Sequence, residues 1–246
     1  MDQFSKEFAS HWDELVGWEK RAAAETAFLS SLIEKFKCKN VLDVALGTGF
    51  HSIELLKQGV RVTSIDVSPA MIEVAKQNAK HHAVTLDVTC ADWIDLDKKL
   101  SQKFDCILCL GNSLACEMDS VKRQKAVYNW ERALSENGII IVDRRNYEAL
   151  LNHEYNFVSK GQYCGETVKI TPSKIAADGT VFSYTFADGK TFQLNMYPLM
   201  SDQINELFLN AGCYPIELYG DQEPFRLNQK VGFYTYIFRR AKNEQD

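Results

Sequence analysis

Two things that the sequence lacks, an excess of positive charge and a long apolar run, restrict the kind of protein it can be. Among its 246 residues, 28 Lys and Arg stand against 33 Asp and Glu, so the net charge is −5 and no basic stripe suits a phosphate backbone. No apolar run approaches the roughly 20 residues of a membrane helix, and residues 1–10 lack the charged-then-apolar pattern of a signal peptide. We therefore expect a cytoplasmic protein with neither a nucleic acid nor a membrane as partner.

The sequence also lacks a paired set of cysteines. Its seven cysteines are odd in number and scattered through apolar segments, so we expect buried thiols rather than a disulfide framework. Cys106 and Cys109 form a C-x-x-C pair, but they lie in the strand-like run 104–110, with no second pair or nearby histidine to complete a zinc site. We predict no metal site.

What the chain does have is a regular alternation of element types. Residues 1–39 show apolar side chains at three- and four-residue steps, which predicts an N-terminal helical cap. The apolar runs that follow predict strands over 41–45, 60–65, 84–90, 104–110 and 138–143. The stretches between them predict helices over 50–58, 69–81 and 121–134. Strands separated by helices pair in parallel through right-handed crossovers, so the pattern predicts a doubly wound α/β sheet.

The texture changes after residue 146. Apolar residues alternate in twos over 168–171, 181–186 and 191–197, and Ala187-Asp188-Gly189-Lys190 suits a hairpin turn, so residues 147–199 are predicted to form a small antiparallel insertion that covers the substrate pocket. A helix over 202–211 and strands over 213–219 and 233–239 then complete a mostly parallel, seven-stranded, Rossmann-like sheet. The core therefore comprises residues 40–146 and 200–241.

The sharpest motif is a strand that runs directly into a glycine-bearing turn and then a helix. In it Gly47 and Gly49 let the backbone approach a ligand, and the helix start offers free N–H groups to anionic atoms. Ala45 at the start of the turn is a further candidate to bind the cofactor. Asp66 follows about 20 residues later at the end of the next strand, where a carboxylate accepts both ribose hydroxyls. The alternative for Asp66 is a cap on the helix that begins near Pro69.

This loop departs from the dinucleotide fingerprint, because Ser52 stands where a third glycine would be. It is similar instead to the loop of S-adenosylmethionine-dependent methyltransferases, which implies that cofactor; an NAD-dependent oxidoreductase is the outside alternative. Asp92 and Trp93 after the third strand, and Leu110 after the fourth, lie at strand ends where ligands bind in such sheets. Met71 is a candidate for the adenine face or for plain core, and Asp43 for a ligand or for an organiser of backbone N–H groups.

A more specific likeness extends over six segments: 12–19, 41–52, 109–113, 143–147, 194–199 and 219–221. Through them the chain resembles the glycine and glycine/sarcosine N-methyltransferases over nearly its whole length. The resemblance implies that Asn112 orients the substrate and that Arg145 holds its carboxylate. It also implies that Trp18 and Arg21 belong to the cofactor site, with Arg21 on the methionyl carboxylate.

The residue chemistry agrees with these roles. Arg145 presents a planar fork that suits a carboxylate, although a structural ion pair is its alternative, and Arg144 beside it must point the other way. Transfer of a methyl group from a sulfonium needs a neutral nitrogen held in line and no metal, so positioning and electrostatics should dominate catalysis. Tyr163, Tyr184 and Tyr197 suit a pocket for a cationic sulfonium, or the core; the resemblance favours Tyr184.

Two segments depart from the family pattern. Gly161 and Gln162 stand where the resembling enzymes carry tyrosines, and Leu114-Ala115-Cys116-Glu117 replaces an aromatic or Thr followed by His. A wider, more polar pocket makes an imidazole N-methyltransferase of a histidine-derived substrate, such as 5-thiohistidine in ovothiol synthesis, the alternative to methylation of glycine or sarcosine. A cofactor-binding sensor without catalysis is a further alternative. The sequence carries no signal for an oligomeric state.

Overall fold

The computed structural model describes residues 3–154, 165–226 and 230–241. The predicted N-terminal cap consists of two helices, α1 (Lys6–Val16) and α2 (Trp18–Lys35). They are separate because Gly17 between them adopts a left-handed conformation with φ 57°, which ends α1 and turns the chain before α2 begins.

The main sheet contains the seven predicted strands. They are β1 (Asn40–Asp43), β2 (Arg61–Asp66), β3 (Asp87–Cys90), β4 (Phe104–Cys109), β5 (Leu134–Arg145), β9 (Cys213–Gly220) and β11 (Phe233–Arg240), and the two-residue β10 (Glu223–Pro224) adds an edge. The order is β10-β9-β11-β5-β4-β1-β2-β3. The first five strands pair in parallel, whereas β11 runs antiparallel to both β5 and β9. This is the doubly wound, mostly parallel arrangement that the alternation predicted.

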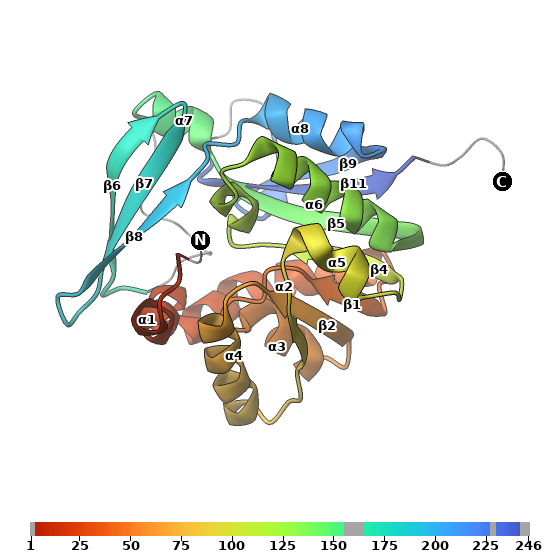
Figure 1. The fold of residues 1–246 in the computed structure, drawn as a ribbon, viewed down its shortest axis with the longest axis horizontal. Coiled ribbons are helices and arrows are strands. Elements are labelled where there is room, and N and C mark those ends of the chain that lie inside the picture. Colours follow the sequence, from red (N-terminus) through yellow and green to blue (C-terminus); the bar gives the residue numbers. More distant parts are fainter. Residues whose placement is uncertain (1–2, 155–164, 227–229, 242–246) are drawn as a thin grey trace.

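Four longer helices connect these strands: α3 (Phe50–Lys57), α4 (Pro69–His81), α6 (Ser120–Ala133) and α8 (Ser201–Asn210). Shorter turns of helix are η1 (Trp93–Asp95), α5 (Leu96–Lys99), η2 (Ser113–Cys116) and α7 (Tyr147–Leu151). Figure 1 shows α6 and α8 on one side of the sheet and α3 and α4 near the opposite end of the molecule. Within the described residues, no helix combines the length and apolar character needed to cross a membrane.

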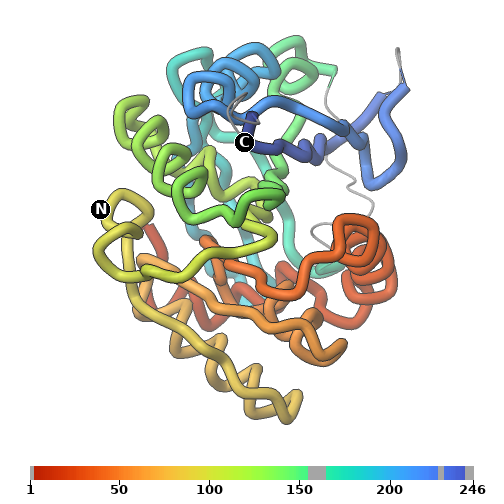
Figure 2. Tube along the Cα trace, turned by 90° about the vertical axis from the view of Figure 1, so that its right-hand side faces the viewer, coloured from red at the N-terminus to blue at the C-terminus, as the bar shows by residue number. Residues whose placement is uncertain are grey.

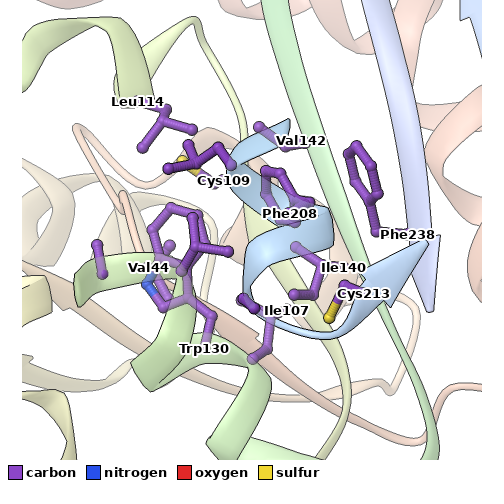
Figure 3. Packing of buried hydrophobic residues seen from close by; sticks show 14 of the residues in the cluster. Val44, Ile107, Cys109, Leu114, Trp130, Ile140, Val142, Phe208, Cys213 and Phe238 are labelled. Atoms are coloured by element: carbon purple, nitrogen blue, oxygen red, sulfur yellow. The ribbon is translucent and has the colours of Figure 1, made fainter. Parts of the chain in front are cut away.

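The two faces of the sheet build two hydrophobic clusters. Along β4, Ile107 and Cys109 pack into the cluster of Trp130 and Phe208 from α6 and α8, as Figure 3 shows. Cys106 points the other way, into the cluster that α2 and α3 cover. Because side chains alternate along a strand, the two cysteines of the C-x-x-C pair lie on opposite faces and cannot chelate one ion. The six described cysteines are all free thiols.

The predicted insertion forms a separate three-stranded antiparallel sheet of β6 (Lys169–Ala176), β7 (Gly179–Thr185) and β8 (Thr191–Met196). It lies at one end of the molecule with α1 beside it (Figure 1), and Phe8 of α1 stacks on Phe192 of β8 at 4.7 Å. Figure 2 shows the N-terminal segments, in red and orange, below the C-terminal segments in blue.

The insertion lies against the end of the main sheet at which β4 finishes. The η2 turn that directly follows β4 contacts β8, and the backbone N–H of Tyr197 donates to the carbonyl of Ala115 at 2.7 Å. The carboxyl ends of the parallel strands therefore face α1 and the insertion, and side chains that follow these strands are brought together there.

Candidate functional site

A cavity lies at the carboxyl ends of β1, β2 and β4, where α1, α2 and the loops after these strands meet. Of the predicted cofactor residues, those that line it are Arg21, Ala45, Gly47, Asp66, Met71, Trp93 and Leu110. The other lining residues are Phe4, Trp12, Val16, Val44, Leu46, Thr48, Phe50, His51, Val67, Gly111, Ser113 and Cys116. Seven of the ten predicted cofactor residues, which are scattered over 90 positions of sequence, therefore share one cavity.

The glycines of the loop have different tasks. Gly47 has φ 55° and lines the cavity. Gly49, with φ 97°, caps the start of α3 and is not among the lining residues; a Cβ there would lie 3.0 Å from Ile53 Cδ1 and 3.3 Å from Ala75 Cβ. Gly49 therefore allows α3 to approach α4 closely, whereas Gly47 leaves its backbone open toward the cavity, with no atom within 4 Å of a Cβ placed there.

Asp66 joins the ends of the first two strands. Its Oδ2 accepts a hydrogen bond from the N–H of Gly47 at 2.8 Å, and its Oδ1 accepts from the N–H of Ser68 at 2.9 Å. Ser68, not Asp66, is the N-cap of α4, since its hydroxyl accepts from the N–H of Met71. The capping alternative for Asp66 is therefore wrong, and the carboxylate faces the cavity beside the glycine turn.

Asp43 is buried beneath the same loop. One carboxylate oxygen accepts from the N–H of Ala45 at 3.1 Å and the other from the hydroxyl of Ser52 at 2.7 Å. Burial raises the pKa of Asp43, and its side chain is not among those that line the cavity. The geometry supports the reading of Asp43 as an organiser of the loop. It also gives Ser52, the residue that replaces the third glycine, a structural task.

Arg21 lines the cavity within a buried polar cluster. Its Nε donates to Glu25 Oε2 at 2.6 Å, and its Cζ lies 4.6 Å from the centre of the Phe50 ring. His51 Nε2 is 2.9 Å from Glu25 Oε1 and 3.1 Å from Arg21 Nη2. Burial alone would raise the pKa of Glu25, but the charges of Arg21 and His51 outweigh it and lower that pKa to about 2. A carboxylate thus holds two cavity-lining side chains in place.

Two predicted cofactor residues lie beside the cavity rather than on it. Trp18 Nε1 donates to Glu54 at 3.1 Å, and its ring stacks on His82 at 4.7 Å. Asp92 caps η1 by accepting from the N–H of Ile94 at 3.1 Å. It does line a neighbouring, wider groove that shares Trp93 with the cavity. Any contact of these two side chains with a cofactor stays a prediction.

Asp143 at the end of β5 holds the loop that follows β4. Its two carboxylate oxygens accept from the N–H of Gly111 at 3.0 Å and from the N–H of Asn112 at 2.6 Å. Burial raises the pKa of this carboxyl to about 6, against the lowering effect of the two N–H donors. Because Gly111 lines the cavity and Asn112 Oδ1 accepts from the N–H of Arg145, Asp143 links the cavity to the surroundings of Arg145.

Asn112 is buried and its side chain is used within the protein. Its Oδ1 accepts from the N–H of Arg145 at 2.9 Å, and its Nδ2 donates to the Tyr147 hydroxyl at 2.8 Å and contacts Met196 Sδ at 3.1 Å. It is 1% exposed and is not among the residues that line the cavity. The structure therefore places Asn112 as a tie between the β4 loop, β5 and the insertion, and direct contact with a substrate stays a prediction.

Arg144 and Arg145 point to opposite sides, as the alternation along β5 predicts. Arg144 forms an ion pair within the protein, in which it donates two hydrogen bonds of 2.7 and 3.0 Å to the carboxylate of Glu148. Arg145 is 2% exposed, and its Cζ lies 4.8 Å from the ring centre of Phe182 and 4.9 Å from that of Phe233. It lies under the insertion and outside the cavity lining, so its predicted contact with a carboxylate is also untested.

The tyrosines predicted for the substrate pocket do not lie together. Tyr184 of β7 is fully buried, and its ring lies 6.1 Å from Trp12, which lines the cavity. Tyr197 instead lies under the guanidinium of Arg123 at 4.0 Å, on the side of α6. Tyr163, together with Gly161 and Gln162 of the same segment, lies outside the described residues.

The sequence reading missed several lining residues, of which His51 and Cys116 are chemically the most distinctive. His51 lies in the first turn of the helix after the glycine loop, and this position could have identified it. Burial raises the pKa of the Cys116 thiol to about 12, so Cys116 lines the cavity as a neutral group.

Comparison with known proteins identifies the family. Residues 41–138 match the family model described as a methyltransferase domain. The chain is 33% identical over its whole length to a glycine/sarcosine N-methyltransferase of Halorhodospira halochloris, covering 91% of that protein. It is 36% identical over 96% of its length to the glycine/sarcosine N-methyltransferase of Parasynechococcus marenigrum (strain WH8102), of which it covers 83%. It is 34% identical over 96% of its length to the human glycine N-methyltransferase, of which it covers 90%.

Solved structures support the fold. An S-adenosylmethionine-dependent methyltransferase from Clostridium acetobutylicum superimposes with a TM-score of 0.77 at 19% identity, over 96% of this chain and 98% of that one. The sheet order, the cavity at its carboxyl edge and the full-length relatives thus agree on an S-adenosylmethionine-dependent class I N-methyltransferase. The chain belongs to the glycine/sarcosine N-methyltransferase family.

Proposed function

We propose that this enzyme methylates the amino nitrogen of glycine or sarcosine with S-adenosylmethionine as the methyl donor. The observation that carries the proposal is the likeness, over essentially the whole chain, to relatives named for that activity. Arg145 at the end of β5 supports it, because an amino-acid substrate brings a carboxylate that a guanidinium fork binds well. The expected partner is therefore a small amino acid, and the expected location is the cytoplasm.

The chemistry of the cavity suits the methyl donor. The carboxylate of Asp66 would accept from the ribose hydroxyls, and the backbone at Ala45 and Gly47 would face the donor closely. Met71, Trp93 and Leu110 would provide apolar contacts to the adenine. Arg21 would hold the methionyl carboxylate. We assign Trp18, Gly49 and Asp92 to the support of these groups, since none of them lines the cavity.

The residues of the chain act by positioning. S-adenosylmethionine, when bound, would supply an electrophilic methyl group for the acceptor nitrogen. Arg145 would orient the acceptor through its carboxylate, and Asn112 would hold Arg145 through the N–H that its Oδ1 accepts. Tyr184 and Tyr163 would shape the acceptor pocket. The amine must reach the site as the free base, because only an unshared electron pair can attack carbon.

A mass measurement tests this function. The protein is incubated with isotopically labelled S-adenosylmethionine and separately with glycine, sarcosine, histidine and 5-thiohistidine, and each amino acid is then analysed by mass spectrometry. We expect glycine and sarcosine to gain labelled methyl groups, and the number gained defines the product. A gain on the histidine compounds alone would overturn the acceptor assignment. A protein that binds S-adenosylhomocysteine but labels none of them would overturn the catalytic one.

A further inference from the structure

We propose that His51 is a further cofactor-binding residue, which binds the methionyl carboxylate of S-adenosylmethionine together with Arg21 while Glu25 fixes both side chains. The proposal rests on the proposed function, since it concerns the same donor. It assigns to this chain a two-residue carboxylate site in which the resemblance to known enzymes had implied Arg21 alone.

The first support is geometric. Arg21 of α2 and His51 of α3 both line the cavity, whereas Glu25, one turn after Arg21, does not. The three side chains are 4%, 7% and 4% exposed in the order Arg21, His51 and Glu25. Glu25 therefore sits behind two neighbouring groups, reaches Arg21 Nε at 2.6 Å and His51 Nε2 at 2.9 Å, and orients both toward the same part of the cavity.

The second support is the balance of charge. Glu25 stays ionised at any pH near neutrality, since Arg21 and His51 lower its pKa to about 2 in spite of its burial. Its negative charge offsets that of Arg21, so this pair alone gives little net attraction for an anion. Among the described residues that line the cavity, Arg21 and His51 are the two whose side chains can carry positive charge. A buried ligand carboxylate needs such a second group.

The third support is the direction of the hydrogen bonds. Nε2 of His51 lies 3.1 Å from Arg21 Nη2, which can only donate, and 2.9 Å from Glu25 Oε1, which can only accept. A ring nitrogen cannot serve both, and donation to the nearer, charged carboxylate is the stronger choice. Nε2–H then belongs to Glu25, which leaves Nδ1 as the ring atom that would meet a bound carboxylate, as a donor when it carries a hydrogen.

The experiment compares a ligand that carries the amino-acid carboxylate with one that lacks it. S-adenosylhomocysteine carries the amino-acid carboxylate, whereas methylthioadenosine has the same nucleoside and thioether without it. Both are titrated by calorimetry into the wild-type protein and into H51Q. We expect H51Q to bind S-adenosylhomocysteine about tenfold more weakly, as loss of one charge-assisted hydrogen bond implies. Its affinity for methylthioadenosine should change less than twofold.

Two controls make the result decisive. H81Q changes an exposed histidine at the end of α4, outside the cavity lining, and should bind both ligands as the wild type does. Thermal unfolding of each variant shows whether the fold persists. Equal losses for both ligands in H51Q, or no loss for either, would overturn the role of His51. Failure of the wild type to bind S-adenosylhomocysteine would instead contradict the proposed function.

Discussion

The cavity that we assign to the cofactor and the Arg145 region lie at the same end of one sheet, but different parts of the chain build them. Loops after β1, β2 and β4 form the cavity, with backbone N–H groups tied to the carboxylates of Asp43 and Asp66. The Arg145 region is made of side chains from β5, the insertion and β11, and Phe182 and Phe233 flank its guanidinium. The first region leaves a cavity that both polar and apolar groups line, whereas the second encloses its cation between two rings.

The two regions should therefore bind the methyl donor and the amino-acid acceptor in different ways. We expect a nucleoside to bind with the loops held as they are, because the carboxylates of Asp43, Asp66 and Asp143 fix the turns around the cavity. A carboxylate that is to meet Arg145 must reach a side chain that is 2% exposed, under the insertion. We therefore expect donor affinity to depend on the loops of the sheet, and acceptor affinity on Arg145 and on the packing of the insertion. Variants in one region should leave the other ligand unaffected.

The largest effect should come from R145K. Lysine keeps the charge but loses the planar fork, so an acceptor carboxylate would be held at one point rather than two. We expect kcat/KM for glycine to fall by a factor on the order of 10³, as for loss of a buried charged contact made with the reacting substrate. Affinity for S-adenosylhomocysteine, measured by calorimetry, should stay within twofold. A comparable loss of both would show that the two regions do not act separately.

Asp143, which links the two regions, should make the stability of the protein depend on pH. Its pKa in the folded protein is raised by burial to about 6 from 3.8, so the folded state holds the proton more tightly than the unfolded state does. The stabilisation is complete below pH 3.8 and is lost as the pH rises through about 6. At 1.36 kcal/mol per pH unit, the loss is about 3 kcal/mol.

The measurement is the free energy of unfolding by urea at intervals from pH 4 to 7, for the wild type and for D143N. Asparagine does not titrate, so the fall in stability between pH 4 and 6 should be clearly smaller in the variant, whatever its absolute stability. Parallel curves for the two proteins would contradict the assignment of this pH dependence to Asp143.

The sequence predicted the helices and strands well because the spacing of apolar residues that indicates them is a local property of the chain. The helix predicted over 69–81 coincides with α4, and apolar alternation predicted the three strands of the insertion. Differences arise where pairing extends an element: β5 begins at Leu134 rather than at 138, since Phe104 pairs with Leu134 before the register shifts. The break at Gly17 was also missed, because a helical period continues on both sides of a left-handed glycine.

The site could be predicted only in part. Positions after parallel strands indicated the edge where ligands bind, and seven of the ten predicted cofactor residues line one cavity there. Closeness along the chain does not give the direction of a side chain, so Trp18 and Asp92 turned out to point to Glu54 and to the N–H of Ile94. His51 was missed although it lies in the first turn of α3, because its contact with Glu25, 26 positions away on another helix, is not visible in the sequence.

After R145K and D143N, a third and smaller effect is expected of D66N, which tests the side of the cavity assigned to the cofactor. The asparagine amide removes the charge that would bind the ribose hydroxyls and weakens the tie to the N–H of Gly47, which lies 2.8 Å from the carboxylate. We expect affinity to fall about thirtyfold, roughly 2 kcal/mol, for S-adenosylhomocysteine and methylthioadenosine alike, since both carry the ribose. This equal loss differs from the selective loss expected of H51Q. If D66N weakened only the ligand with the amino-acid group, Asp66 would bind the ammonium of that group rather than the ribose, and the donor would lie in the opposite direction along the cavity.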